Sequence, residues 1–201
     1  MSASQKKELM EGYLGIKFRT IRGEGDYPPG FAELFPEFKE CAGICNKYDM
    51  VPQNAGNFSV RIAGGMAITA TGSNLALLEK DDIVFVSRCS MEDMKVEYIG
   101  VNEPSSETFL HHEIYQCRPD VTAIAHAHNI PESSKMVGIV KETIREEPYG
   151  TAAFAGLACE TLGEKESIIV LKNHGYLAVG KSLREAVGLM ISTHLKCFAS
   201  K

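Results

Sequence analysis

Apolar residues recur along the chain with two different periods, and these periods predict a mixture of helices and strands. Steps of three and four residues are typical of amphipathic helices, and they predict helices over 5–17, 31–48, 105–118, 131–141, 155–162 and 182–200. Short runs rich in β-branched and aromatic residues favour strands, and these are 58–62, 66–71, 83–87, 95–99, 123–128, 167–171 and 176–179. Ser73 or Asn74 is suited to cap a further short helix through Leu75 to Leu78.

Some neighbouring strands are joined by short turns and others by helices. The sequence therefore predicts an α/β fold, with a mixed sheet and helices on its faces. A chain of 201 residues suits one fairly large domain. Residues 22–30 are dense in glycine and proline, which marks a turn or linker. We expect an N-terminal extension over residues 1–30, as an arm on the domain or on a neighbouring subunit, and a folded domain over residues 31–201.

The composition is that of a globular protein, with 44% hydrophobic and 23% charged residues. The formal net charge is -5 and the 21 basic residues are scattered, which argues against nucleic-acid binding. No apolar run approaches the roughly 18 residues that a transmembrane helix needs, and residues 1–7 lack the apolar core of a signal peptide. We expect no membrane association and a cytoplasmic location.

Six cysteines are spread along the chain, at positions 41, 45, 89, 117, 159 and 197. None forms a Cys-x-x-Cys pair, and their density is far below that of a small disulfide-stapled domain. Cys41 and Cys45 lie four apart on a predicted helix, which is typical of packing. We expect all six to be reduced and none to hold a structural zinc ion.

The most informative stretch ends the strand at 123–128, where His126 and His128 stand two residues apart. Side chains two apart in a strand point to the same face, so both imidazoles project together while Ala125 and Ala127 face the other way. This geometry suits two ligands of one metal. The alternative is one hydrogen-bonded core histidine and one histidine at a strand end, and the pair alone does not decide between them.

A third histidine, His174, sits at the end of the apolar strand over 167–171. Three imidazoles that meet at strand ends would leave an open coordination position, which is the pattern of a catalytic metal site. Gly175, the next residue, is consistent with a crowded backbone near a ligand, although a glycine after a strand is more often a plain turn.

Glu107 follows Ser105 and Ser106 at the predicted start of the helix over 105–118. A helix N-terminus offers unpaired amide groups and a positive dipole end, so the two serines are suited to hold a phosphate while Glu107 acts as base or additional ligand. The plainer alternative is a capping arrangement without further function. Asn57 and the pair Thr71-Gly72, taken singly, are ordinary turn residues.

A rival metal grouping joins Glu107 to His111, one helical turn later, with His112 adjacent. A carboxylate and an imidazole four apart on one helix face can share an ion. His112 falls about 100° round the helix from His111, so the three side chains do not readily converge. We interpret both histidines, and His194 on the last helix, as surface residues or as supports for other groups.

Five short motifs in a fixed order resemble those of the class II aldolase and adducin family, which includes aldolases and epimerases of sugar phosphates. They are Gly56-Asn57-Phe58-Ser59, Thr71-Gly72, Pro104-Ser105-Ser106-Glu107, His126-Ala127-His128 and Asn173-His174-Gly175. The resemblance runs from about residue 31 to the end of the chain. Five ordered motifs are far more specific than any one of them.

The resemblance implies a three-layer α/β/α domain with a central mixed, largely antiparallel sheet. It also implies a homotetramer with active sites between subunits. The implied cofactor is a zinc ion, or another divalent metal, held by His126, His128 and His174, with Glu107 as the acid/base group. The residues that the resemblance implies for binding the substrate phosphate are Asn57, Thr71, Gly72, Ser105 and Ser106.

The function so implied is a zinc-dependent aldolase that reversibly cleaves a small ketose 1-phosphate, similar to fuculose 1-phosphate, to dihydroxyacetone phosphate and an aldehyde. The alternatives are an epimerase or dehydratase of a sugar phosphate, or a non-catalytic adducin-like module. Family members usually place a proton-donating tyrosine in a C-terminal tail, and the sequence that ends at Lys201 is expected to lack it. The span from His128 to His174 also looks short, and its one tyrosine, Tyr149, has no assigned role.

Overall fold

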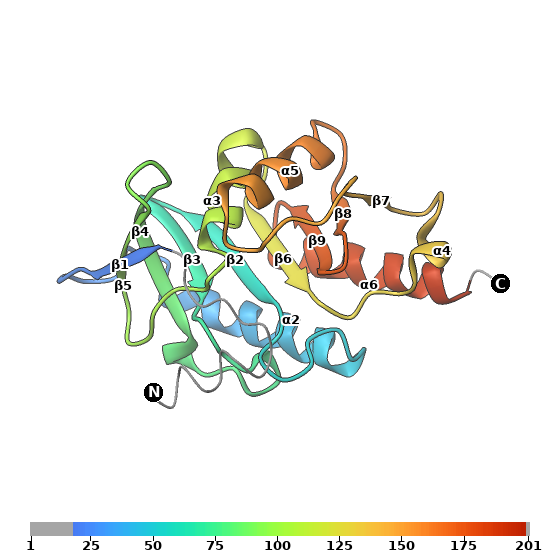
Figure 1. The fold of residues 1–201 in the computed structure, drawn as a ribbon. Coiled ribbons are helices and arrows are strands. Elements are labelled where there is room, and N and C mark those ends of the chain that lie inside the picture. The colour runs from blue at the N-terminus through green and yellow to red at the C-terminus, as the bar shows by residue number, and fades with distance from the viewer. Residues whose placement is uncertain (1–17, 200–201) are drawn as a thin grey trace, which may run out of the picture.

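In the computed structural model, which describes residues 18–199, nine strands form one sheet in the order β1-β5-β4-β3-β2-β6-β9-β8-β7 (Figure 1). The strands are β1 (Arg19–Arg22), β2 (Asn57–Ile62), β3 (Gly65–Thr69), β4 (Ile83–Ser90), β5 (Lys95–Ile99), β6 (Ala123–Ala127), β7 (Lys141–Glu142), β8 (Ile168–Leu171) and β9 (Gly175–Gly180). Within the described chain, the two outermost pairs, β1 with β5 and β7 with β8, are the parallel ones. The expected mixed, largely antiparallel sheet is confirmed.

Helices cover both faces of this sheet (Figure 1). Helices α2 (Phe35–Lys47) and α6 (Leu183–Ala199) share one hydrophobic core with the sheet, and α3 (Thr108–Cys117) and α5 (Ala152–Leu162) share another. Strand alternation divides the two cores. In β6, Ala125 and Ala127 face α2 and α6, whereas Ile124 faces α3 and α5. The expected three-layer α/β/α architecture is confirmed.

Short helical turns precede or join the main elements. The helix predicted over 31–48 begins as a 3-10 turn at Ala32–Leu34, and α2 then carries Pro36 in its first turn, where the missing N–H costs no hydrogen bond. A 3-10 helix at Leu75–Leu77 is capped by the Asn74 side chain, which accepts from the N–H of Ala76 at 3.0 Å. Another lies at Lys80–Asp82. None of the helices in residues 18–199 is long and apolar enough to cross a membrane.

The helix predicted over 131–141 is wrong for most of its length. Only α4 (Ser133–Met136) is helical, and the chain then turns through Gly138, whose φ is +74°. It continues into the edge strand β7, which pairs in parallel with β8. A strand partner that is distant in the sequence thus outweighs the local apolar spacing.

Strand β1 lies within the stretch predicted to be an N-terminal extension, and its sequence has no alternation of apolar and polar residues that would predict a strand. It pairs in parallel with β5, and the ring of the preceding Phe18 lies 4.7 Å from that of Phe109. The described part of the extension is therefore packed on the domain. The helix predicted over 5–17 lies outside the described residues.

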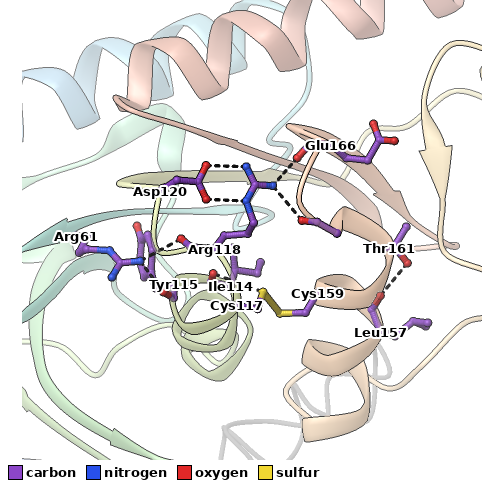
Figure 2. Close-up of a disulfide and its surroundings, with 11 residues drawn as sticks. Arg61, Ile114, Tyr115, Cys117, Arg118, Asp120, Leu157, Cys159, Thr161 and Glu166 are labelled. Atoms are coloured by element: carbon purple, nitrogen blue, oxygen red, sulfur yellow. Dashed lines mark hydrogen bonds and ion pairs between the residues drawn. A yellow bond between two sulfur atoms is a disulfide. The ribbon is translucent and has the colours of Figure 1, made fainter.

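The expectation that all six cysteines are reduced is wrong, because Cys117 and Cys159 form a disulfide (Figure 2). Cys117 ends α3 and Cys159 lies in α5, and the two helices pack side by side with these Cα atoms 6.3 Å apart. Arg118 reinforces the junction by donating to the main-chain oxygens of Gly163 and Glu166, beyond the end of α5. The remaining four cysteines are free, as expected.

We predict that a thiol reagent counts four cysteine thiols in the denatured, unreduced protein and six after reduction. Replacing both cysteines, by Cys117→Ser and Cys159→Ser, should lower the free energy of unfolding by about 3 kcal/mol, because the cross-link restricts the unfolded chain. Cys89→Ser removes a free, partly buried thiol and is the control, with a change of less than ~1 kcal/mol. Six thiols before reduction would contradict the pairing.

Candidate metal centre

Three histidines converge where the end of β6 meets the start of β9. His126 lies in β6, His128 follows that strand, and His174 precedes β9. The ring centroids are 4.7 Å apart for His126 and His128, 4.9 Å for His126 and His174, and 4.7 Å for His128 and His174. The imidazoles therefore form a nearly equilateral triangle, as side chains that surround one ion would.

Gly175 allows the two strands to approach each other at this point. A Cβ atom there would lie 2.3 Å from the main-chain oxygen of Ala127 and 2.9 Å from Cε1 of His126. Any larger residue would push β9 away from β6 and separate His174 from the other two histidines. The crowding suggested by the sequence is present, and the neighbouring strand causes it.

Glu107 is the residue that immediately precedes α3, and its carboxylate completes the cluster. Its Oε1 lies 2.7 Å from Nε2 of His174, and its Oε2 lies 3.2 Å from Nε2 of His126. One ligand atom from each of these residues and from His128 can be chosen so that all four lie within 4.8 Å of one another. Three imidazoles and one carboxylate form a donor set that zinc accepts.

The hydrogen bonding of His126 indicates that a cation belongs here. Its Nδ1 donates to the main-chain oxygen of Tyr176 at 2.7 Å, so Nε2 carries a lone pair. This Nε2 is fully buried, has no hydrogen-bond partner in residues 18–199, and faces the carboxylate of Glu107. Two acceptor atoms this close in the interior require a positive charge between them. The residues present therefore fit a divalent metal.

Protonation is a poor source of that charge, because burial opposes it. Burial lowers the pKa of His126 to about 4, and burial together with the neighbouring His126 and His174 lowers that of His128 to about 3. Burial raises the pKa of Glu107, but His126, His174 and the hydrogen bonds to the carboxylate outweigh it and hold the pKa well below its usual range. At neutral pH the cluster thus combines an ionised carboxylate with the neutral imidazoles of His126 and His128, which is the state that metal binding needs.

Two loops lie side by side next to the N-terminus of α3. The N–H of Thr71 donates to the oxygen of Glu103 at 2.9 Å, and the N–H of Ser105 donates to the oxygen of Thr69 at 3.1 Å. Ser105 and Ser106 are buried, whereas Gly72 is exposed. The structure therefore brings the Thr71-Gly72 turn to the same helix N-terminus as the two serines.

Asn57 is turned towards the metal cluster. Its Nδ2 donates to Oε2 of Glu107 at 2.7 Å, and its Oδ1 lies 2.6 Å from Nε2 of His111. The phosphate-binding role expected for Asn57 stays a prediction, as do those of Thr71, Gly72, Ser105 and Ser106.

The rival grouping of Glu107 with His111 and His112 is not formed as a metal site. His111 is buried and bonded to Asn57, so it is a support for other groups. His112 instead lines a separate cavity of about 400 Å³ beside Tyr115 and Arg61. His194 is buried against the ring of Tyr176.

Two aromatic residues at the site were missed by sequence reasoning. The ring of Tyr149 stacks on His174 with a centroid distance of 5.7 Å, and the ring of Phe154 meets His174 edge-on at 5.2 Å. In the sequence Tyr149 is a lone tyrosine with no assigned role, and Phe154 lies in no recognisable motif. Their position on the histidine arises from the packing of α5, which the sequence does not specify locally.

A family model confirms the class of protein that this fold and site suggest. The model of the class II aldolase and adducin N-terminal domain matches residues 37–198. The chain belongs to the class II aldolase and adducin family, and the expectation of kinship with its lyases is confirmed.

Individual relatives show which kinds of enzyme are similar to this chain. The 5-methylthioribulose-1-phosphate/5-deoxyribulose-1-phosphate aldolase of Rhodospirillum rubrum is 35% identical over 152 residues, which cover 68% of this chain and 66% of that protein. The L-fuculose phosphate aldolase of Methanocaldococcus jannaschii is 35% identical over 164 residues, which cover 74% of this chain and 86% of that protein. A solved structure of an L-fuculose 1-phosphate aldolase has a TM-score of 0.69 at 26% identity, with 84% of each chain covered.

We predict that the metal-free protein loses stability as the pH falls from about 6.5 to about 4. The pKa of a free histidine is about 6.5. In this pH range the unfolded chain therefore binds protons at His126, His128 and His111, whereas the folded chain keeps these buried side chains unprotonated. At pH 5 each of the three should cost about 2 kcal/mol relative to pH 7. Urea unfolding after chelation measures this, and His128→Gln should show a shallower pH dependence. A free energy of unfolding that is equal at both pH values would contradict the burial of neutral histidines.

Proposed function

We propose that this protein is a zinc-dependent aldolase that reversibly cleaves a small ketose 1-phosphate, similar to fuculose 1-phosphate, to dihydroxyacetone phosphate and an aldehyde. The observation that carries the proposal is the cluster of Glu107 with His126, His128 and His174, in which a buried imidazole lone pair faces a carboxylate. The names of the two aldolase relatives support a substrate that is a phosphorylated ketose.

The three histidines would hold the metal, with the Glu107 carboxylate beside it. When bound, a divalent ion supplies a Lewis acid that polarises the ketose carbonyl and its neighbouring hydroxyl. Glu107 is then the group that moves a proton to and from the substrate, because it is the one carboxylate within the cluster. Its burial excludes bulk water from this transfer.

The substrate phosphate would bind at the N-terminus of α3. The helix dipole favours an anion there, and the adjacent turn places Thr71 and the exposed Gly72 beside the two serines. Asn57, Thr71, Gly72, Ser105 and Ser106 are the residues we assign to this cradle. The hydrogen bonds that tie the two loops together support the assignment, because they hold the Thr71-Gly72 turn and the two serines next to each other before a ligand arrives.

We also propose that the protein works as a homotetramer with its active sites at subunit interfaces. Two apolar side chains between β6 and α5 support an interface, since Val137 and Ile144 are 81% and 73% exposed. Light scattering would give the mass of the assembly.

We predict that His128→Ala changes the metal content of the protein, whereas Glu107→Gln changes kcat. His128→Ala should remove the divalent ion and abolish cleavage, whereas Glu107→Gln should lower kcat by about 100-fold to 10,000-fold through the loss of proton transfer. Elemental analysis gives the metal content, and NMR of the products distinguishes aldol cleavage from epimerisation or dehydration. His112→Ala, one position from His111 but outside the cluster, is the control. Purified protein without a divalent ion, together with intact cleavage by His128→Ala, would rule out the proposal.

We predict that Ser106→Ala weakens binding of the phosphate group. Loss of one hydrogen bond to a charged group should raise KM for the ketose 1-phosphate by about 10-fold to 100-fold, with a parallel loss of inhibition by inorganic phosphate. Ser87→Ala, on β4 outside the cradle, is the matched control. An unchanged KM would show that the phosphate binds elsewhere.

A further inference from the structure

A buried chain of hydrogen bonds leads from the Glu107 carboxylate to four residues outside the cluster that could hold a metal. It alternates between two elements. Asn57 and Ser59 lie two apart on one face of β2, and Glu107, His111 and Tyr115 follow one another at steps of four along and just before α3. All five residues are buried, and the most exposed of them, Asn57, is 6% exposed.

The links of this chain are short and continuous. Asn57 Nδ2 lies 2.7 Å from Glu107 Oε2, and Asn57 Oδ1 lies 2.6 Å from His111 Nε2. Ser59 Oγ then lies 2.6 Å from His111 Nδ1 and 2.8 Å from the hydroxyl of Tyr115. Tyr115 also lies 3.4 Å from the main-chain oxygen of Thr122.

The chemistry of the groups fixes the direction of the bonds between Glu107 and Ser59. An ionised carboxylate only accepts, so Asn57 donates through Nδ2 and must accept through Oδ1. His111 therefore donates from Nε2 and accepts at Nδ1. Ser59 gives its only proton to His111, which makes Tyr115 the donor to Ser59. From Ser59 to Glu107 the protons therefore point towards the carboxylate, while the Tyr115 hydroxyl proton lies between Ser59 and the main-chain oxygen of Thr122.

His111 is in the right state for this arrangement. Burial lowers its pKa to about 4, so the ring is neutral and can carry the single proton on Nε2. Without a donor at that position, the Asn57 amide could turn over and present its oxygen to the Glu107 carboxylate. Two acceptors would then face each other and the carboxylate would move.

We propose that His111 is a positioning residue, which locks the Asn57 amide so that Asn57 holds Oε2 of Glu107 in place beside the metal ligands. The inference rests on the proposed acid/base role of Glu107. It gives the Asn57 side chain a role in orienting Glu107 besides its proposed place in the phosphate cradle, and it makes Ser59 the donor to Nδ1 of His111. Within residues 18–199 the hydrogen bonds of the His111 side chain go to Asn57 and Ser59, so its effect on Glu107 passes through Asn57.

Kinetics of matched variants test the positioning role. His111→Phe should lower kcat by about 10-fold to 100-fold, with metal content unchanged and KM within about threefold of the wild type. His111→Gln, whose amide again offers a donor and an acceptor, should recover part of kcat. Asn57→Ala should lower kcat to a similar extent, and adding His111→Phe to it should cause little further loss. His112→Phe on the same helix is the control.

A different split would overturn the proposal. If Asn57→Ala raises KM and leaves kcat intact, the amide serves phosphate and not Glu107. If His111→Phe and His111→Gln lose kcat only in proportion to their thermal stability, His111 is structural. Thermal unfolding of each variant separates these cases.

Nitrogen NMR of the histidine rings tests the chain without any activity measurement. The wild type should show His111 as a neutral ring protonated on Nε2 between pH 6 and 8, and Ser59→Ala should admit the other tautomer. A ring protonated on Nδ1 in the wild type would overturn the proposal even in an active enzyme. Should the wild type cleave no ketose phosphate, the proposed function fails by itself, while this spectrum still decides the hydrogen-bond direction.

Discussion

The arrangement of this protein depends on two acceptor atoms that face each other in its interior. Nε2 of His126 and Oε2 of Glu107 lie 3.2 Å apart, and the proton of the imidazole is committed to Tyr176 on the other side of the ring. Such a pair is costly unless a cation joins it. Binding of a metal would therefore offset a cost that the folded chain already carries, at a site whose four side chains are already brought together.

The sheet and one pair of helices hold these atoms in place. The close approach of β6 and β9 at Gly175 brings the three imidazoles together. Glu107 reaches them from the start of α3, which packs on the same face of the sheet. At its other end α3 is joined to α5 by the Cys117–Cys159 disulfide (Figure 2), and α5 lays Phe154 against His174. The helix that follows the proposed acid/base group and the helix that covers a proposed metal ligand are thus cross-linked to each other.

Much of this could be predicted from the sequence, because it depends on local patterns. The strand period places His126 and His128 on one face, and apolar spacing gives most of the helices and strands. The features that were missed depend on partners distant in the chain. Strands β1 and β7 exist through parallel pairing with β5 and β8, and the disulfide exists because α3 and α5 are neighbours. The four-residue spacing of Glu107, His111 and Tyr115 is visible in the sequence. Asn57 and Ser59, which link these three side chains by hydrogen bonds, lie on β2, far away in the sequence.

X-ray absorption of the zinc-loaded protein tests the central claim most directly, because it reports the atoms around the ion. The account predicts one zinc per chain, with three imidazole nitrogens and carboxylate or water oxygen at about 2.0–2.2 Å, and loss of the imidazole signal in proportion when a ligand histidine is replaced. Failure to take up zinc, or a sulfur ligand at about 2.3 Å, would contradict it.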